Sequence, residues 1–465
     1  MKVLKFGGTS VGTSESLGNV KKIVEGLKDR CVVIVSALGG LTDKLIATAK
    51  MAAEGNGSYK DEMQSIRLRH YNIVNDVIAE DKKEEVLEII NPLLDELERN
   101  YDGIALLGDL PGRTLDVVVS FGERISSVIV SRMIDGARHF NSLDYVKTEK
   151  WFNKNIADTE LTNTLIKDTF SDDYEIAVAG GFISTDRDTG EITNLGRGGS
   201  DYTAALIAAA LDAEVLQIWT DVDGFMTADP RIIPEAFVVD HMTFIESMEL
   251  CSFGAKVIYP PTIYPVFHKN IPIRILNTFN PEAPGTWITD SAKVTDIPVK
   301  GISAVRQTSL VEIYGECASN VPEINSRTFN ALAKNGINVY LVRQPDDEKA
   351  VFAFAVGTPD LERALKVVEE EFAPEILSGD ITETLAIPDL ATLAVVGDNI
   401  RSDTRIKARL FNTLQRDGID VLASSTGSSQ TTISFVIPEQ DVTRALRLAH
   451  SSFFGGTGIS DSETL

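Results

Sequence analysis

Near its start the chain reads Val3-Leu4-Lys5-Phe6-Gly7-Gly8-Thr9-Ser10, so a short apolar run passes directly into two glycines. The run has the length of a strand, and the glycines allow a tight turn whose backbone N–H groups can approach an anion closely. Apolar residues at 20, 23, 24 and 27 then follow a helical period. The stretch therefore predicts a strand, a phosphate-binding turn and a helix, although an ordinary tight turn with a surface lysine would fit the same residues.

The same order recurs further along the chain. Residues 31–35 form a continuous run rich in β-branched residues, which is typical of a strand buried on both faces of a parallel sheet. Residues 176–179 precede Gly180-Gly181, and residues 215–219 precede Thr220-Asp221. Strands that end in Gly, Thr or Asp before a helix indicate an α/β sheet, in which ligands bind at the carboxyl ends of the strands.

Composition excludes several classes of protein. The chain has 465 residues, enough for roughly three domains of about 150 residues, with 43% hydrophobic and 24% charged residues. A net charge of −24 repels phosphate backbones and argues against nucleic acid as a partner. The three cysteines and five histidines are scattered without ligand spacing, which argues against a metal site and against a disulfide framework. We see no secretory signal or membrane span, and expect a cytoplasmic protein.

The second half contains an internal repeat. Residues 329–339 match residues 411–421, with Phe, Asn, Leu, Gly, Ile and Val at the same places. Each copy reads strand, helix, strand, strand, helix, and Gly336 and Gly418 suit helix C-caps. We therefore expect two small α+β units after a larger α/β domain, which itself carries a charged helical insert at about 59–98 and a loop at 280–285.

A second glycine-rich stretch reads Leu195-Gly196-Arg197-Gly198-Gly199-Ser200-Asp201. Arginine pairs bidentately with a carboxylate, and the glycines free the backbone around it. Ser200 or Asp201 is expected to N-cap the helix that follows. The cluster is denser than a cap requires, so it favours a binding function.

Three other stretches indicate a function only in combination. Alone, Ser120-Phe121-Gly122-Glu123-Arg124 is typical of a helix start with a solvent glutamate, and Gly254-Ala255-Lys256-Val257 of a loop with a surface lysine. The third stretch, Thr220-Asp221-Val222-Asp223-Gly224 with Asp229-Pro230-Arg231, is typical of two turns.

In this order and spacing, the five motifs resemble the aspartate kinase branch of the amino-acid kinase family, and the resemblance extends over essentially the whole chain. It implies an α/β three-layer sandwich with a mainly parallel central sheet, followed by two ferredoxin-like ACT units. The implied domains are a catalytic domain at 1–295 and ACT-like regulatory units at 300–378 and 388–458. Some relatives continue into a homoserine dehydrogenase, so the chain could be the kinase portion of a longer enzyme.

The resemblance implies transfer of the γ-phosphate of ATP to the β-carboxylate of L-aspartate, with Mg²⁺ arriving with ATP. Catalytic positions would be Lys5, Gly8 and Asp201. Nucleotide-binding positions would be Lys5, Gly7, Gly8, Thr220, Asp221, Arg231, Lys256 and Val257. Aspartate-binding positions would be Ser36, Thr42, Glu123, Phe182, Arg197 and Ser200. The attacking carboxylate is already ionised at neutral pH, so no general base is needed.

The resemblance also implies regulation and self-association. Paired ACT units in this family bind an amino acid, which predicts feedback inhibition by lysine or threonine and a homodimer or higher homo-oligomer. Two positions depart from the family pattern: Tyr259-Pro260 stands where relatives usually have His-Pro, and Met226 where many have tyrosine.

Two alternatives stay open. One is another amino-acid kinase that acts on glutamate, carbamate or a nucleoside monophosphate, against which Glu123 and Arg197 argue because together they match an α-amino acid. The other is an amino-acid sensor that has lost activity. The presence of Lys5, Arg197 and Asp221 argues against the sensor.

Overall fold

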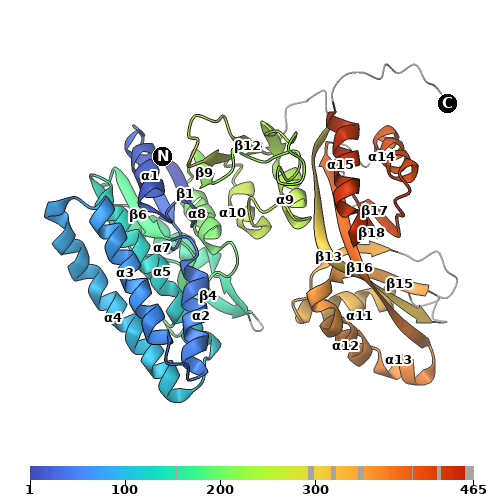
Figure 1. Cartoon of the computed structure of the whole chain (residues 1–465), viewed down its shortest axis with the longest axis horizontal. Helices are drawn as coiled ribbons and strands as arrows, with labels where there is room; N and C mark the ends of the chain where they lie inside the picture. Colours follow the sequence, from blue (N-terminus) through green and yellow to red (C-terminus); the bar gives the residue numbers. More distant parts are fainter. Residues whose placement is uncertain are drawn as a thin grey trace. The chain divides into compact units, whose positions relative to one another are not determined.

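A computed structural model describes residues 1–151, 154–291, 298–315, 321–343, 350–398, 400, 402–426 and 431–455. The chain divides into two compact units (Figure 1). Unit 1 comprises Met1–Phe225 and Val257–Ala292, and unit 2 comprises Met226–Lys256 and Lys293–Leu465.

Unit 1 is built on a mainly parallel sheet with the strand order β12-β11-β9-β1-β2-β6-β3. All neighbouring pairs in this order are parallel except β11 with β12. The sequence prediction of a parallel sheet with central strands at 3–6 and 31–35 is confirmed. Its strands are β1 (Lys2–Phe6), β2 (Cys31–Val35), β3 (Ala137–Phe140), β6 (Ile176–Gly180), β9 (Val215–Thr220), β11 (Ile273–Asn277) and β12 (Thr286–Thr289).

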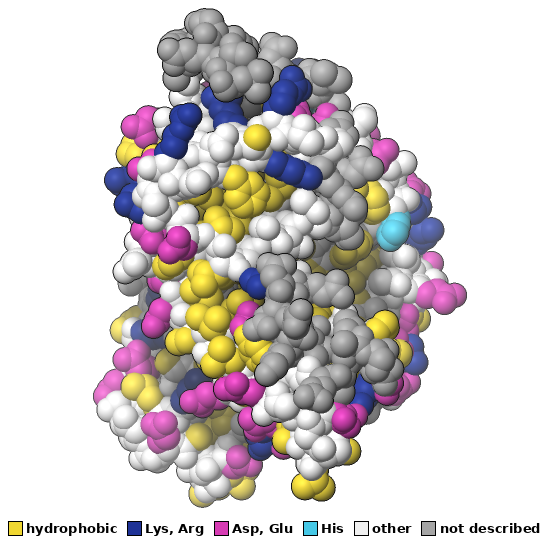
Figure 2. Space-filling view, turned by 90° about the vertical axis from the view of Figure 1, so that its right-hand side faces the viewer, with side chains coloured by type: hydrophobic (Ala, Val, Ile, Leu, Met, Phe, Trp, Pro, Cys, Tyr) yellow, Lys and Arg dark blue, Asp and Glu magenta, His cyan; other side chains and the backbone are white. Residues whose placement is uncertain are grey.

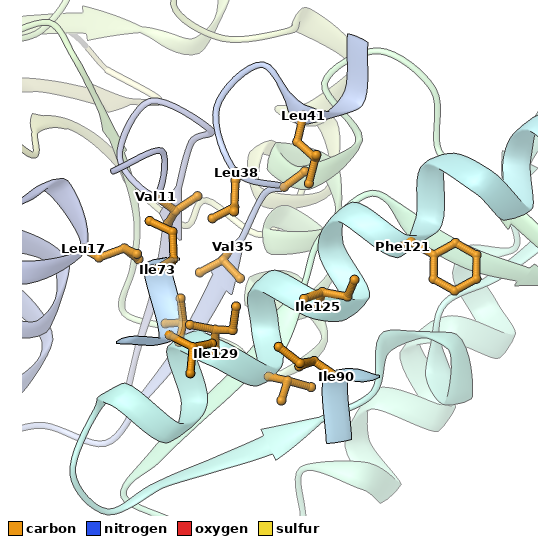
Figure 3. Packing of buried hydrophobic residues seen from close by; sticks show 14 of the residues in the cluster. Val11, Leu17, Val35, Leu38, Leu41, Ile73, Ile90, Phe121, Ile125 and Ile129 are labelled. Atoms are coloured by element: carbon orange, nitrogen blue, oxygen red, sulfur yellow. The ribbon is translucent and has the colours of Figure 1, made fainter. Parts of the chain in front are cut away.

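Helices cover both faces of this sheet. Its helices are α1 (Ser14–Glu25), α2 (Leu41–Ala53), α3 (Tyr59–Val77), α4 (Lys83–Leu107), α5 (Gly112–Met133), α6 (Ser142–Tyr145), α7 (Thr159–Thr169), α8 (Gly199–Ala210) and α10 (Tyr264–Phe267), with 3₁₀ turns at Glu80–Lys82 and Pro260–Thr262. Val33 and Val35 join the core cluster that includes α1 to α5 (Figure 3). Ile34 faces the other way because side chains alternate along a strand, and α8 lies on that face.

A second, smaller sheet in unit 1 has the order β5-β4-β7-β8. Its strands are β4 (Lys147–Trp151), β5 (Lys154–Ala157), β7 (Ile183–Asp186) and β8 (Ile192–Asn194). The strand β7 follows Gly181 and Phe182 directly, so this sheet connects to the end of β6 in the main sheet.

The predicted helical insert at 59–98 is present as α3 and α4, but its predicted end is wrong. Helix α4 continues through Pro92 to Leu107. Leu97, Tyr101 and Ile104 are buried in the core cluster at helical spacing. Charged residues are densest up to residue 98, whereas the apolar stripe extends the helix nine residues further.

Unit 2 contains a six-stranded antiparallel sheet with the order β14-β15-β13-β16-β18-β17. The predicted repeat is confirmed, since each copy runs strand, helix, strand, strand, helix. The first copy has β13 (Val299–Gly315), α11 (Val321–Lys334), β14 (Val339–Arg343), β15 (Ala350–Gly357), α12 (Leu361–Glu371) and α13 (Ala373–Ser378). The second has β16 (Ile381–Gly397), α14 (Thr404–Arg416), β17 (Ala423–Thr426), β18 (Thr432–Pro438) and α15 (Val442–Phe454). Gly336 and Gly418 take φ values of 66° and 64° after their helices, as C-cap glycines do.

Residues 226–256, with β10 (His241–Thr243) and α9 (Phe244–Ser252), also belong to unit 2. Ala228 and Ile233 lie in the same core cluster as residues of β18 and α15. Thr227 Oγ1 and His450 Nε2 are 2.9 Å apart. This segment therefore packs with the second repeat, although residues 257–380 separate it from that repeat in the sequence.

The surface of unit 2 carries hydrophobic side chains in groups between charged ones on the face seen in Figure 2. Among the described residues, no helix is both long and apolar enough to cross a membrane.

Candidate active site

A cavity of about 340 Å³ opens at the carboxyl ends of β1, β2 and β6. It lies where an α/β sheet is expected to bind a ligand. Loops after three strands and two helices contribute its walls. The lining residues are Lys5, Gly8, Ser36, Ala37, Leu38, Gly39, Gly40, Thr42, Glu123, Phe182, Gly196, Arg197, Gly198, Gly199, Ser200 and Asp201.

The cavity unites residues that lie far apart in the sequence. All six predicted aspartate-binding residues and all three predicted catalytic residues line it. The structure thus places these residues together, while their individual roles stay predictions.

Lys5 and Asp201 form an ion pair inside the cavity. Lys5 Nζ lies 2.6 Å from Asp201 Oδ1, with side-chain exposures of 12% and 11%. Asp201 lies in the first turn of α8, where a negative charge interacts favourably with the helix dipole. The expectation that Ser200 or Asp201 caps this helix is wrong. The N-cap is Gly198 with φ of 71°, which leaves the side chains of Ser200 and Asp201 facing the cavity.

Glu123 is buried in the middle of α5, so the alternative reading of a helix start with a solvent glutamate is wrong. Its Oε1 accepts a hydrogen bond of 3.0 Å from the Ala37 N–H. Among the described residues, no group hydrogen-bonds to Oε2. Burial raises the pKa of the Glu123 carboxyl to about 8, and the Ala37 N–H and the charge of Lys5 oppose that rise. Oε2 of this carboxyl thus lacks a hydrogen-bond partner among the described residues.

Close backbone packing fixes the end of β6 beside the cavity. A Cβ on Gly181 would lie 2.6 Å from Ser200 Cα, and one on Gly180 would lie 2.9 Å from the Glu123 carbonyl oxygen. Only glycine permits these approaches. Phe182 then adopts a φ of 67°, which is costly for a bulky side chain, and its N–H donates to Thr203 Oγ1 at 3.0 Å.

Arg197 is exposed on a loop that is held by polar contacts. Asn194 Nδ2 donates to Asp116 Oδ1 at 2.5 Å, and Asn194 Oδ1 accepts from the Gly196 N–H at 2.9 Å. Asp116 belongs to α5, two turns before Glu123. Burial raises the pKa of Asp116, and the amides of Asn194 and Asn155 oppose the rise. One helix therefore carries both Glu123 and the anchor of the Arg197 loop.

The predicted nucleotide-binding residues are more dispersed. Gly7 follows Lys5, and its N–H donates to the Trp219 carbonyl at 3.2 Å, next to Thr220. Thr220 Oγ1 donates to Asp221 Oδ1 at 3.1 Å.

Three further predicted nucleotide-binding residues lie, in the sequence, near the first two points where the chain passes between the units. Arg231 and Lys256 belong to unit 2, and Val257 is the first residue of the returning part of unit 1. Arg231 pairs with Asp229 through bonds of 2.9 and 2.7 Å.

Sequence reasoning missed several residues of the cavity and its surroundings. Ala37 to Gly40 line the cavity after β2. Gly39-Gly40 could have been found, because paired glycines that follow a strand are the same pattern that marked Gly7-Gly8. Tyr259, marked in the sequence only as a departure from the family pattern, packs against Gly198, where an added Cβ would lie 2.3 Å from Tyr259 Cβ. Asp116 and Asn194 gave no local signal, because their role depends on contacts between α5 and β8.

A search of the described residues finds no group of three or more His, Cys, Asp or Glu side chains that could hold a metal ion. The cavity offers two carboxyl groups. One is Asp201, which pairs with Lys5, and the other is the buried Glu123. These residues suit a metal ion that is carried mainly by phosphate oxygens and water.

Comparison with known proteins gives matches over both parts of the chain. A model of the amino acid kinase family matches residues 1–277, and an ACT domain model matches residues 311–372 and 393–453. A bifunctional aspartokinase/homoserine dehydrogenase of Haemophilus influenzae is 31% identical over 471 residues. That alignment covers 99% of this chain and 57% of the relative, so the chain spans somewhat more than half of that protein's length.

Solved structures show the same fold. The crystal structure of E. coli aspartokinase III in complex with aspartate and ADP (R-state) has a TM-score of 0.82 and 26% identity, covering 98% of this chain and 100% of that one. The same enzyme in complex with lysine and aspartate (T-state) has a TM-score of 0.74 and 26% identity, covering 98% and 99%. The predicted fold class, an amino-acid kinase sandwich followed by ACT units, is confirmed.

Proposed function

Because the chain belongs to the amino acid kinase family, we propose that it is an aspartate kinase, which transfers the γ-phosphate of ATP to the β-carboxylate of L-aspartate to give 4-phospho-L-aspartate. One observation carries the proposal: a single cavity contains an ion-paired lysine, an arginine without a partner among the described residues, and a buried carboxyl with an unpaired oxygen. These groups match the phosphoryl group, the α-carboxylate and the α-ammonium. The aspartate and ADP bound to E. coli aspartokinase III support the same choice.

The amino-acid end of the substrate would be held by complementary charges. Arg197 would pair with the α-carboxylate, since a guanidinium fork suits a planar anion. Glu123 Oε2 would accept from the α-ammonium, which would supply the partner that this buried oxygen lacks. Ser36, Thr42, Phe182 and Ser200 would shape the remaining walls.

The reacting end lies near Lys5. Phosphoryl transfer requires positioning and charge neutralisation more than covalent chemistry from the protein. Lys5 would stabilise negative charge on the transferred group, Asp201 would hold Lys5 in place, and Gly8 would offer its backbone to the phosphate. The substrate carboxylate attacks phosphorus directly, so no proton has to be removed first.

ATP would enter with Mg²⁺ bound to its phosphates, with Gly7, Thr220, Asp221, Arg231, Lys256 and Val257 as further nucleotide-binding residues. The ADP in E. coli aspartokinase III supports a nucleotide partner. Magnesium would neutralise charge on the phosphates, which adds to the effect of Lys5.

Regulation is proposed to reside in the ACT units, at 300–378 and 388–458, with catalysis at 1–295. The lysine complex of E. coli aspartokinase III supports an amino-acid effector, lysine or threonine. The hydrophobic groups on unit 2 in Figure 2 support a homodimer formed through these units. A biosynthetic role upstream of lysine, threonine and methionine, in the cytoplasm, completes the proposal.

The decisive experiment measures ATP turnover with a panel of single amino acids, with hydroxylamine present to trap any acyl phosphate as a hydroxamate. We expect a hydroxamate with aspartate alone, and a smaller yield when the effector is added. A hydroxamate with glutamate instead would overturn the choice of substrate. Absence of amino-acid-dependent turnover would overturn the kinase assignment and favour a sensor.

A further inference from the structure

Arg69 connects two loops at the edge of the cavity. It lies on α3, in the helical insert, outside every motif that the sequence suggested. Its Nη2 donates to the Gly39 carbonyl at 2.7 Å and to the Gly12 carbonyl at 3.1 Å. Gly12 lies on the loop after β1, and Gly39 on the loop after the neighbouring strand β2. One guanidinium therefore links the loops that follow two adjacent parallel strands.

The two loops are in direct backbone contact. A Cβ on Gly39 would lie 2.9 Å from the Gly8 carbonyl oxygen, and a Cβ on Gly12 would lie 3.1 Å from the same oxygen. Gly8 and Gly39 both line the cavity. A movement of either loop would thus shift the backbone of Gly8, where the transferred phosphate is proposed to bind.

The hydrogen bond from Arg69 to the Gly39 carbonyl also orients the N–H group of Gly40. The carbonyl of Gly39 and the N–H of Gly40 belong to one planar trans peptide, so they point in opposite directions. With the carbonyl held by Arg69, the Gly40 N–H points away from α3. Gly40 lines the cavity and is the N-cap of α2. Arg69 therefore fixes the direction of a backbone donor that belongs to the cavity wall.

The residues around Arg69 hold the same loops by packing. Ile73, one turn further along α3, shares the core cluster with Val11 and Leu38, which adjoin Gly12 and Gly39 (Figure 3). This apolar contact brings α3 to the loops, but it does not orient peptide groups. The hydrogen bonds of Arg69 add that directional constraint.

We propose that Arg69 is a positioning residue for the active site, which holds the loops of Gly8 and Gly39-Gly40 in the arrangement needed for phosphoryl transfer. The inference rests on the proposed function for its effect on turnover, but its effect on the loops is independent of it. Arg69 acts through these loops and does not line the cavity itself.

Arg67 provides a matched control on the same helix. Its Nη2 pairs with Asp95 at 2.9 Å and with Glu98 at 2.8 Å, and its side chain is 12% exposed. It therefore makes two strong polar contacts within the helical insert and none with the glycine loops among the described residues. Arg67→Met and Arg69→Met each remove an arginine while keeping an unbranched apolar stem.

The test compares hydrogen–deuterium exchange and kinetics in these variants. In Arg69→Met we expect amide exchange in residues 8–13 and 38–42 to rise about tenfold, as expected for loss of a hydrogen bond from a charged group. We expect kcat/KM for aspartate to fall by about tenfold or more, and Arg69→Lys to recover part of both losses. In Arg67→Met, exchange in these segments and kcat/KM should stay within about twofold of wild type.

Unchanged exchange in both segments of Arg69→Met would overturn the proposal, as would equal losses of kcat/KM in the two Met variants at equal thermal stability. A wild-type protein without aspartate-dependent turnover would instead contradict the proposed function. In that case the exchange measurement still decides whether Arg69 orders the two loops.

Discussion

Lys5 Nζ and Asp201 Oδ1 lie 2.6 Å apart, and this ion pair joins the central strand β1 to the first turn of α8. Both side chains are about nine-tenths buried. An isolated charge would be costly at such a site, so each residue compensates the charge of the other inside the cavity. The pair therefore ties the geometry of the sheet to that of the helix that carries the Ser200 side chain.

Replacement of Lys5 by Met should lower kcat by about 10²–10³-fold, because it removes a cation that is proposed to stabilise the transferred phosphoryl group. Steady-state kinetics with aspartate and ATP measure the effect. Lys2→Met is the control, since Lys2 lies on the same strand but pairs with Asp29 outside the cavity. The kcat of the double variant Lys5→Met/Asp201→Asn should lie within about twofold of the kcat of Lys5→Met alone, because both changes disrupt the same ion pair. Fully additive losses would show that Asp201 acts independently of Lys5.

The pKa of Glu123 predicts a pH dependence of aspartate binding. Burial raises this pKa to about 8, so the carboxyl is mostly protonated at neutral pH in the empty cavity. Only the ionised form pairs with an α-ammonium. We therefore expect kcat/KM for aspartate to rise about tenfold per pH unit up to roughly pH 8, because this parameter follows the ionisation of the free enzyme. A flat profile between pH 6 and 8 would contradict the role of Glu123.

The same group predicts a pH dependence of stability. Its pKa rises from 4.5 in the unfolded chain to about 8 in the folded protein, so the folded state binds the extra proton between these values. The free energy of unfolding should therefore fall as the pH rises from about 4.5 to 8. Glu123→Gln removes this titration and should flatten the slope in urea unfolding, with the variant more stable than wild type near pH 8. An unchanged slope would place the carboxyl in a more polar environment than the structure shows.

Asn194 should control aspartate affinity through the Arg197 loop. Its amide bridges Asp116 and the Gly196 N–H, so Asn194→Ala should free the loop and raise the KM for aspartate about fivefold to tenfold. The kcat should change little, because Lys5 and Asp201 stay in place. Asn155→Ala is the control, since Asn155 also contacts Asp116, at 3.5 Å, but makes no side-chain hydrogen bond to the loop among the described residues. An equal rise of KM in both variants would assign the effect to Asp116 alone.

Two glycines should respond to Ala in opposite ways. A Cβ on Gly181 would lie 2.6 Å from Ser200 Cα, so Gly181→Ala should destabilise the protein by about 1–3 kcal/mol. Gly103 lies inside α4 with no atom within 4 Å of an added Cβ, so Gly103→Ala should stabilise it by about 0.5–1 kcal/mol. Urea unfolding of both variants measures the difference. Equal stabilities would contradict the close approach at Gly181.

The sequence predicts the parallel sheet well because burial on both faces gives a strand a local signature. Residues 31–35 are all buried, as the continuous apolar run indicates. Both glycine-rich turns were likewise visible, since paired glycines after a strand mark a close approach of the backbone. Their meeting in one cavity follows from the strand order of the sheet, which no local pattern in the sequence gives.

Other features depend on contacts that no local pattern encodes. Gly122 and Glu123 suggested a helix start, yet they lie in mid-helix. A Cβ on Gly122 would lie 2.6 Å from Ala37 Cβ, so this glycine allows α5 to approach the loop after β2 and delivers Glu123 to the cavity. The role of Arg69 could not be predicted from the sequence, because a charged residue on an amphipathic helix has the same sequence pattern whether it contacts water or two backbone carbonyls.

Residues 226–256 pack with the second repeat of unit 2, whereas residues 257–292 return to unit 1. The polypeptide thus crosses between the units three times. A single recombination point near residue 292 would transplant the C-terminal repeats without the segment on which Ala228 and Ile233 sit. C-terminal repeats taken from another protein would then leave these apolar residues exposed unless residues 226–256 were exchanged or adapted as well. The path of the chain through the two units therefore constrains how a protein of this family can acquire different C-terminal repeats in evolution, and any chimaera should be joined at three points.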